Sequence, residues 1–89
     1  MQFAIFGLTL SSSWGNGHAT LWRGLLKALA SRGHTATFYE KDVSYYRDTR
    51  DGWQPPKGIR LRLYGELSDI ITEANRELDD SDVAIVTSY

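Results

Sequence analysis

The chain has 89 residues, of which 42% are hydrophobic and 24% charged, and its formal net charge at pH 7 is −1. This length suits one small domain, and the near-neutral charge without a basic stripe argues against a nucleic-acid partner. The absence of cysteine excludes disulfide bonds and thiolate zinc sites and suits a reducing, cytoplasmic location. No apolar run approaches the roughly 20 residues that cross a bilayer, so no transmembrane segment is expected.

The first predicted element is a strand over residues 2–7, a nearly all-apolar run typical of a strand buried on both faces. It lacks the basic start of a signal peptide, and Trp14 follows where a cleavage site would need small residues. Residues 8–17 then form a loop longer than the usual strand-to-helix connection. In parallel sheets, ligands bind outside the carboxyl ends of the strands, so this loop is the first candidate site.

An amphipathic helix is predicted over about residues 18–32, with Gly33 closing it in the left-handed conformation. Trp22 and Leu26 lie beside its apolar stripe and either cover more of the sheet or meet a neighbour outside this chain. The stripe itself is predicted to face the sheet and follows the i, i+4, i+7, i+8 spacing of Leu21, Leu25, Ala28 and Leu29.

Alternation of strands and helices continues to the end of the chain. The run over residues 59–64 alternates apolar and polar side chains, which indicates a strand with one polar face at a sheet edge. The whole order predicts an α/β fold with a parallel Rossmann-like sheet of about four strands in the order 3-2-1-4 and two main helices. The other predicted elements are a strand over 35–40, a short helix capped by Asp42 and reaching about residue 49, a helix over 66–79 and a strand over 83–86.

The glycines of the first loop favour an anion site. Gly15 and Gly17 permit close backbone approach, and the amides that open the next helix attract negative charge. However, Thr20 stands where the dinucleotide fingerprint needs its third glycine, and no Gly-Lys-Ser/Thr follows as in a Walker loop. A phosphate or sugar site and a purely structural turn both remain open.

His18 is the one residue of this region with acid–base capacity near neutral pH. The positive end of a helix favours a neutral imidazole, which can accept a proton. The alternative is a histidine that only caps the helix or bonds a loop carbonyl. His34, at the other end of the helix, is expected to be a surface turn residue.

Several other side chains are candidates for contact with sugars. Glu40 ends the second strand 23 positions after Gly17, close to where dinucleotide-binding folds place an acid on the ribose. Glu40 and Asp42 are therefore candidates for hydrogen bonds to sugar hydroxyls. The alternatives are that Glu40 is solvated and that Asp42 caps the next helix. Trp53, with Tyr45 and Tyr46, either lines an acceptor groove or packs a loop onto the sheet. The acidic turn at residues 79–82 is expected to be solvated, and no metal site is expected.

Three tracts of the sequence resemble a known family. They are FGLTLSSSWGNGHATLWRGL over residues 6–25, ALASRGH over 28–34 and FYEKDVSYY over 38–46. Together they closely resemble the start of bacterial glycosyltransferases of the CgeB-like (spore-maturation) group, and residues 82–89 fit more loosely. The resemblance implies a GT-B architecture, in which two Rossmann-like domains hold the acceptor and a nucleotide-diphosphate sugar, with no divalent metal strictly required and no other cofactor.

By this resemblance, His18 is the catalytic candidate, approaching the acceptor hydroxyl or the diphosphate at the end of the glycine-rich turn. Residues 1–89 would be the first part of an acceptor-side domain without its donor domain, inactive alone. The alternatives are an NAD(P)-type dinucleotide-binding module and a non-catalytic interaction module that self-associates or is covered by a partner. Position in the sheet and this resemblance together give the candidates for substrate or phosphate contact, which are Ser11, Ser12, Ser13, Trp14, Gly15, Asn16, Gly17, Glu40 and Asp42.

Overall fold

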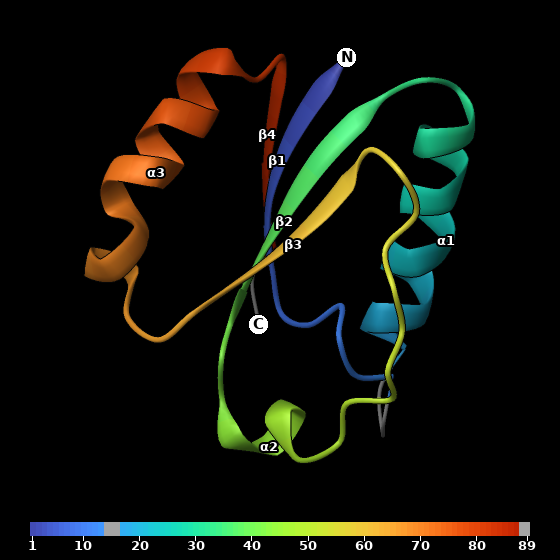
Figure 1. Ribbon diagram of the computed structural model, residues 1–89, viewed down its shortest axis with the longest axis vertical. Helices are drawn as coiled ribbons and strands as arrows, with labels where there is room; N and C mark the ends of the chain where they lie inside the picture. The colour runs from blue at the N-terminus through green and yellow to red at the C-terminus, as the bar shows by residue number, and fades with distance from the viewer. Residues whose placement is uncertain (14–16, 88–89) are drawn as a thin grey trace.

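The computed structural model describes residues 1–13 and 17–87 of the chain. Their strands form one parallel sheet in the order β3-β2-β1-β4, which confirms the predicted α/β class and strand order (Figure 1). No helix in these two ranges is long and apolar enough to cross a membrane. The elements are β1 (Gln2–Gly7), α1 (His18–Ser31), β2 (Thr35–Lys41), α2 (Ser44–Arg47), β3 (Ile59–Tyr64), α3 (Leu67–Asp80) and β4 (Val83–Val86).

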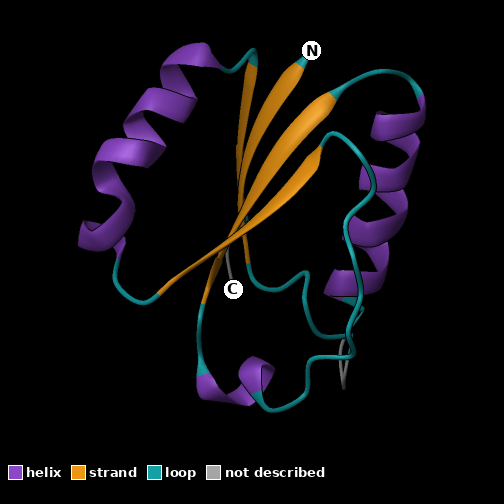
Figure 2. Ribbon diagram, in the orientation of Figure 1, coloured by secondary structure: helices purple, strands orange, loops and turns teal. Residues whose placement is uncertain are grey.

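The two long helices cover opposite faces of the sheet. Figure 2 shows α1 on one side of the strands and α3 on the other. Neighbouring side chains of β2 alternate between two clusters: Phe38 packs with Leu26 of α1, and Tyr39 packs with Ile70 and Ala74 of α3. This alternation is the period of two that a strand buried on both faces requires.

Helix α1 is rotated relative to the orientation predicted from its apolar stripe. Leu26 is fully buried, whereas Leu21 is 75% and Leu25 47% exposed. The inward face is anchored by Trp22, whose ring meets Phe38 edge to face with centroids 5.5 Å apart. Two neighbouring stripes satisfy the same helical spacing, and the one that contains Trp22 covers the sheet. The predicted inward face was therefore wrong for Leu21 and Leu25. Leu29 packs against the core as predicted, and Trp22 and Leu26 cover the sheet, which was one of the two alternatives for them.

The short second helix also differs from its prediction. It spans only Ser44–Arg47, and its N-cap residue is Val43, which has no capping side chain. Asp42 therefore does not cap it. By contrast, β3 lies at the sheet edge as predicted, and its polar face contacts α3 through Arg62, whose Nε lies 2.9 Å from Glu73 Oε2.

Candidate functional site

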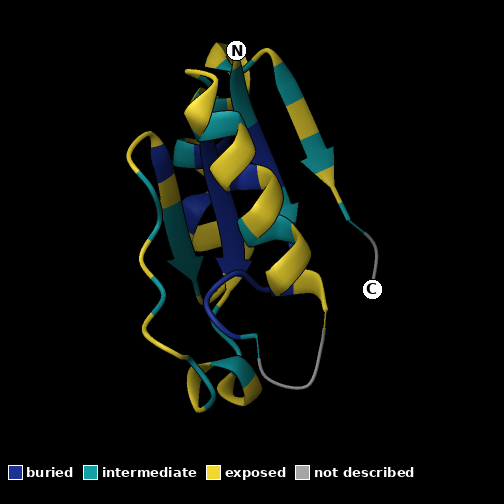
Figure 3. Cartoon of the chain, turned by 90° about the vertical axis from the view of Figure 1, so that its right-hand side faces the viewer, coloured by how far each residue is buried: buried dark blue, intermediate teal, exposed yellow. Residues whose placement is uncertain are grey.

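The loop after β1 lies at the carboxyl edge of the sheet and is largely interior. Thr9, Leu10 and Ser12 have no exposed surface, and Ser11 is also buried. Figure 3 shows this loop as a continuous buried segment below the strands, before the residues that are not described. Because buried backbone and hydroxyl groups need partners, the loop must be held by polar groups from elsewhere in the chain.

Glu40, at the end of β2, supplies the central acceptor for this loop. Its Oε1 accepts hydrogen bonds from the backbone N–H of Leu10 at 2.8 Å and of Ser11 at 3.0 Å. Its Oε2 accepts from the Ser11 hydroxyl at 2.7 Å. The side chain is fully buried, so Glu40 fixes the backbone path of the loop and is not solvated.

An arginine from the segment after α2 balances this buried carboxylate. Arg50 Nε donates to Ser11 Oγ at 2.8 Å, and its Nη2 lies 3.8 Å from Glu40 Oε2. The same Nη2 donates to Asp42 Oδ1 at 2.9 Å, and Arg47 Nε reaches that oxygen at 3.2 Å. Hydrogen bonds from Arg50 and Arg47 hold the pKa of Asp42 below its ordinary value. Two carboxylates and two guanidinium groups thus form one cluster in which the positive and negative charges balance.

A second group of contacts ties the end of the loop to residues 49–51. The hydroxyl of Ser12 donates to the Thr49 carbonyl at 2.9 Å, and Ser13 Oγ donates to Asp51 Oδ2 at 2.8 Å. Arg23 of α1 forms a bidentate ion pair with Asp51, in which Nη1 donates to Oδ2 at 3.0 Å and Nη2 donates to Oδ1 at 2.7 Å. The hydrogen bonds from Arg23 hold the pKa of Asp51 well below its usual range.

The structure thus brings together five of the residues singled out from the sequence, and all five bond to protein groups: Ser11, Ser12, Ser13, Glu40 and Asp42. Gly17 and His18 are exposed at the start of α1, and His18 borders a cavity of about 280 Å³ with Leu21, Trp22 and Leu25. Trp14, Gly15 and Asn16 lie outside the described residues. The assignment of all these residues to ligand contact stays a prediction.

The aromatic residues do not share one groove. Tyr45 and Tyr46 belong to α2 and meet edge to face, with 5.1 Å between their ring centroids. Trp53 instead lies against α1, with the Arg23 guanidinium 5.0 Å from its ring centroid. His34 is partly buried and packs edge-on against Phe3, away from His18.

The sequence did not reveal the charged partners of the loop. Arg23, Arg50 and Asp51 have no local pattern that marks them, although a buried acid at a strand end requires donors from somewhere. Within residues 1–13 and 17–87, no three His, Asp or Glu side chains gather as a metal site would need.

Fold and site together define a Rossmann-like parallel α/β unit in which a hydroxyl-rich loop is clamped at the carboxyl edge of the sheet. Comparison with protein-family models, curated proteins and solved structures finds no match to this chain.

Proposed function

We propose that this chain forms the acceptor-side part of a glycosyltransferase that uses a nucleotide-diphosphate sugar. The observation that carries the proposal is the position of His18, exposed as the first residue of α1 at the carboxyl edge of the sheet. Parallel sheets bind their ligands at this edge. The tract that resembles glycosyltransferases, residues 6–25, covers this loop and helix start.

In the proposed reaction, the acceptor oxygen forms a bond to the anomeric carbon of the sugar while the bond from that carbon to the diphosphate breaks. His18 takes or orients the proton of the acceptor hydroxyl. The N–H groups at the start of α1 favour the negative charge of the diphosphate or the acceptor. Glu40 and Ser11 act as positioning residues, since their polar atoms hold the loop that precedes His18.

The burial of Glu40 argues against the dinucleotide-binding alternative. An acid that binds a ribose must present its carboxylate to the ligand. Here both carboxylate oxygens accept hydrogen bonds from Leu10 and Ser11, and the side chain has no exposed surface. A ribose contact would require this network to open.

The proposal is tested by titrating the isotope-labelled chain with UDP-glucose, GDP-mannose, dTDP-glucose and NAD by NMR. We expect saturable shifts of the amides of residues 17–19 with at least one nucleotide sugar, at millimolar concentration because the donor domain is not part of this chain, since the start of a helix favours the negative charge of the diphosphate. The His18→Ala variant should weaken that binding at least about fivefold. His34→Ala, at the other end of α1, is the matched control and should bind as the wild type does. Micromolar binding of NAD without a response to the nucleotide sugars would overturn the proposal.

A further inference from the structure

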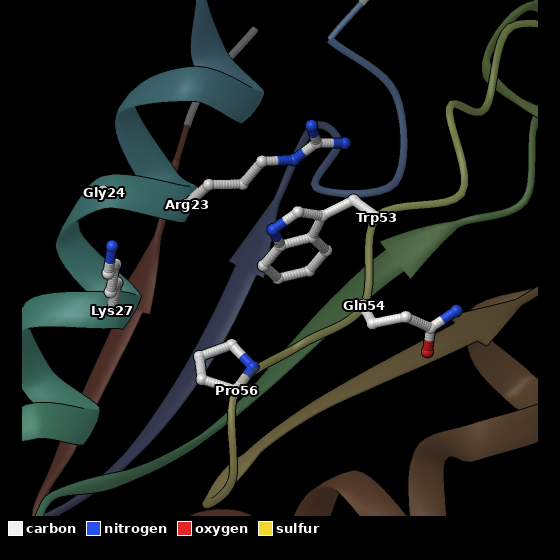
Figure 4. A pocket seen from close by; sticks show the side chains of 6 residues that line it. All are labelled: Arg23, Gly24, Lys27, Trp53, Gln54 and Pro56. Carbon is white, nitrogen blue, oxygen red and sulfur yellow. The ribbon is translucent and has the colours of Figure 1, made fainter.

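A second cavity, separate from the start of α1, lies between the middle of that helix and the loop that leads to β3. Its volume is about 350 Å³, within the range of sites that hold small ligands. Figure 4 shows the Trp53 indole turned toward α1, between the Arg23 guanidinium and the Pro56 ring. The cavity is lined by Arg23, Gly24, Lys27, Trp53, Gln54 and Pro56.

The aromatic wall of this cavity is held in place before any ligand arrives. Trp53 packs against the core cluster that includes Leu26. Its ring also lies beside the Arg23 guanidinium, which is fixed by the Leu10 carbonyl at 3.0 Å and by Asp51. A ring held on two sides loses little freedom when a ligand stacks on it, which favours binding.

The opposite wall contains a glycine that the fold itself does not require. Gly24 lies in the interior of α1, where glycine is a poor helix former. A Cβ at this position would meet no atom within 4 Å. Packing among the described residues therefore does not require a glycine here, and Gly24 leaves its part of the cavity wall without a side chain.

The charge of the cavity selects the ligand. Arg23 and Lys27 are like charges four residues apart on one face of α1, an arrangement that is unfavourable without an anion. Asp51 compensates Arg23. Among the described residues no hydrogen bond or ion pair engages the Lys27 ammonium, and no acidic residue lines the cavity.

We propose that this cavity binds an anionic saccharide, a sugar ring that carries a phosphate or a carboxylate. The apolar C–H face of the ring stacks on Trp53, and the anion lies at Lys27. A nucleobase fits less well, because reading its edge needs fixed donors and acceptors, and the one amide of the lining, on Gln54, turns away from α1 (Figure 4). Binding at this cavity does not depend on sugar transfer at His18, so the two proposals are tested independently.

The test follows the Trp53 indole N–H signal by NMR, assigned from Trp53→Phe, during titration with glucose 1-phosphate, glucuronate, glucose, inorganic phosphate and UMP. We expect saturable shifts with glucose 1-phosphate, glucuronate or both, and the stronger of the two identifies the anion. Glucose and inorganic phosphate should bind at least about tenfold more weakly, because each offers only half of the interaction.

Three variants separate the site from general effects on the chain. Lys27→Gln should weaken binding about tenfold, whereas Arg76→Gln, which removes the same charge from α3, should not. Gly24→Ala should raise the Tm by about 4 °C through the better helix former while weakening binding at least about fivefold. Equal affinity for glucose, tighter binding of UMP, unchanged binding in Gly24→Ala, or no saturable shift with either anionic sugar up to about 20 mM would each overturn the proposal.

Discussion

Glu40 is the residue on which the loop after β1 depends, and its replacement should be costly. In Glu40→Gln, one oxygen can still accept from the amides of Leu10 and Ser11. The new amide group, however, would face the Ser11 hydroxyl and Arg50, which are donors in the present arrangement. We expect the free energy of unfolding to fall by about 2–3 kcal/mol, because a buried charge-assisted bond is lost and donors are left unpaired. Urea unfolding at pH 7 measures this.

Asp79→Asn is the control for this measurement, since Asp79 is exposed at the end of α3. It removes one negative charge without touching the loop, so its unfolding free energy should stay within about 0.5 kcal/mol of the wild type. If Glu40→Gln unfolds like Asp79→Asn, the carboxylate does not hold the loop.

At this scale the sequence predicted the candidate positions better than their roles. Serines before a helix and an acid at a strand end were recognisable as polar groups at the carboxyl edge. Their partners were not, because Arg50 lies far along the chain from Ser11 and no local spacing links the two. The sequence singled out Trp53 as a candidate for lining a groove, but not Gly24 and Lys27 of α1 beside it, because that cavity forms only when the loop before β3 folds back onto α1.

At the scale of elements, the orientation of α1 gives the sharpest prediction. Leu26 is fully buried against the sheet, whereas Leu25 is about half exposed. Leu26→Ala should lower the free energy of unfolding by about 2–4 kcal/mol, because it removes apolar contact and leaves a cavity. Leu25→Ala, the matched variant one position earlier, should cost less than about 1 kcal/mol. A larger loss of stability in Leu25→Ala than in Leu26→Ala would instead support the inward face predicted from spacing.

The elements themselves were more predictable than their faces. Each parallel strand must be reached by a crossover, and right-handed crossovers leave few possible strand orders, so the order β3-β2-β1-β4 was accessible from the sequence. The inward face of α1 was not, because adjacent apolar stripes give nearly the same periodicity. The start and length of α2 were also predicted wrongly. Asp42 is a residue type that caps helices, but its carboxylate pairs with two arginines, Arg47 and Arg50.

For the whole molecule, the connection between the two loops at the carboxyl edge depends on ionised carboxylates. Arg23 joins α1 to Asp51, and Arg50 joins the segment after α2 to Asp42 and to the loop that carries Ser11. Both aspartate pKa values lie below their ordinary value of 3.8, with hydrogen bonds from arginine as the main cause. Protons therefore bind more readily to the unfolded chain, and acid weakens the fold.

The Asp51→Asn variant tests this coupling through the pH dependence of unfolding. A lowered folded-state pKa contributes stability that is present above about pH 5 and is lost as the pH falls through 3.8 toward the folded value. At pH 7 the variant should be less stable than the wild type by less than about 1 kcal/mol, because Asp51 is partly exposed and its pair is screened. That difference should shrink between about pH 5 and pH 3. Urea unfolding at pH 7, 5, 4 and 3 measures it, with Asp79→Asn expected to keep the slope of the wild type. If the free energy of unfolding of Asp51→Asn and of the wild type changes equally with pH, the Arg23–Asp51 pair does not contribute to the loss of stability in acid.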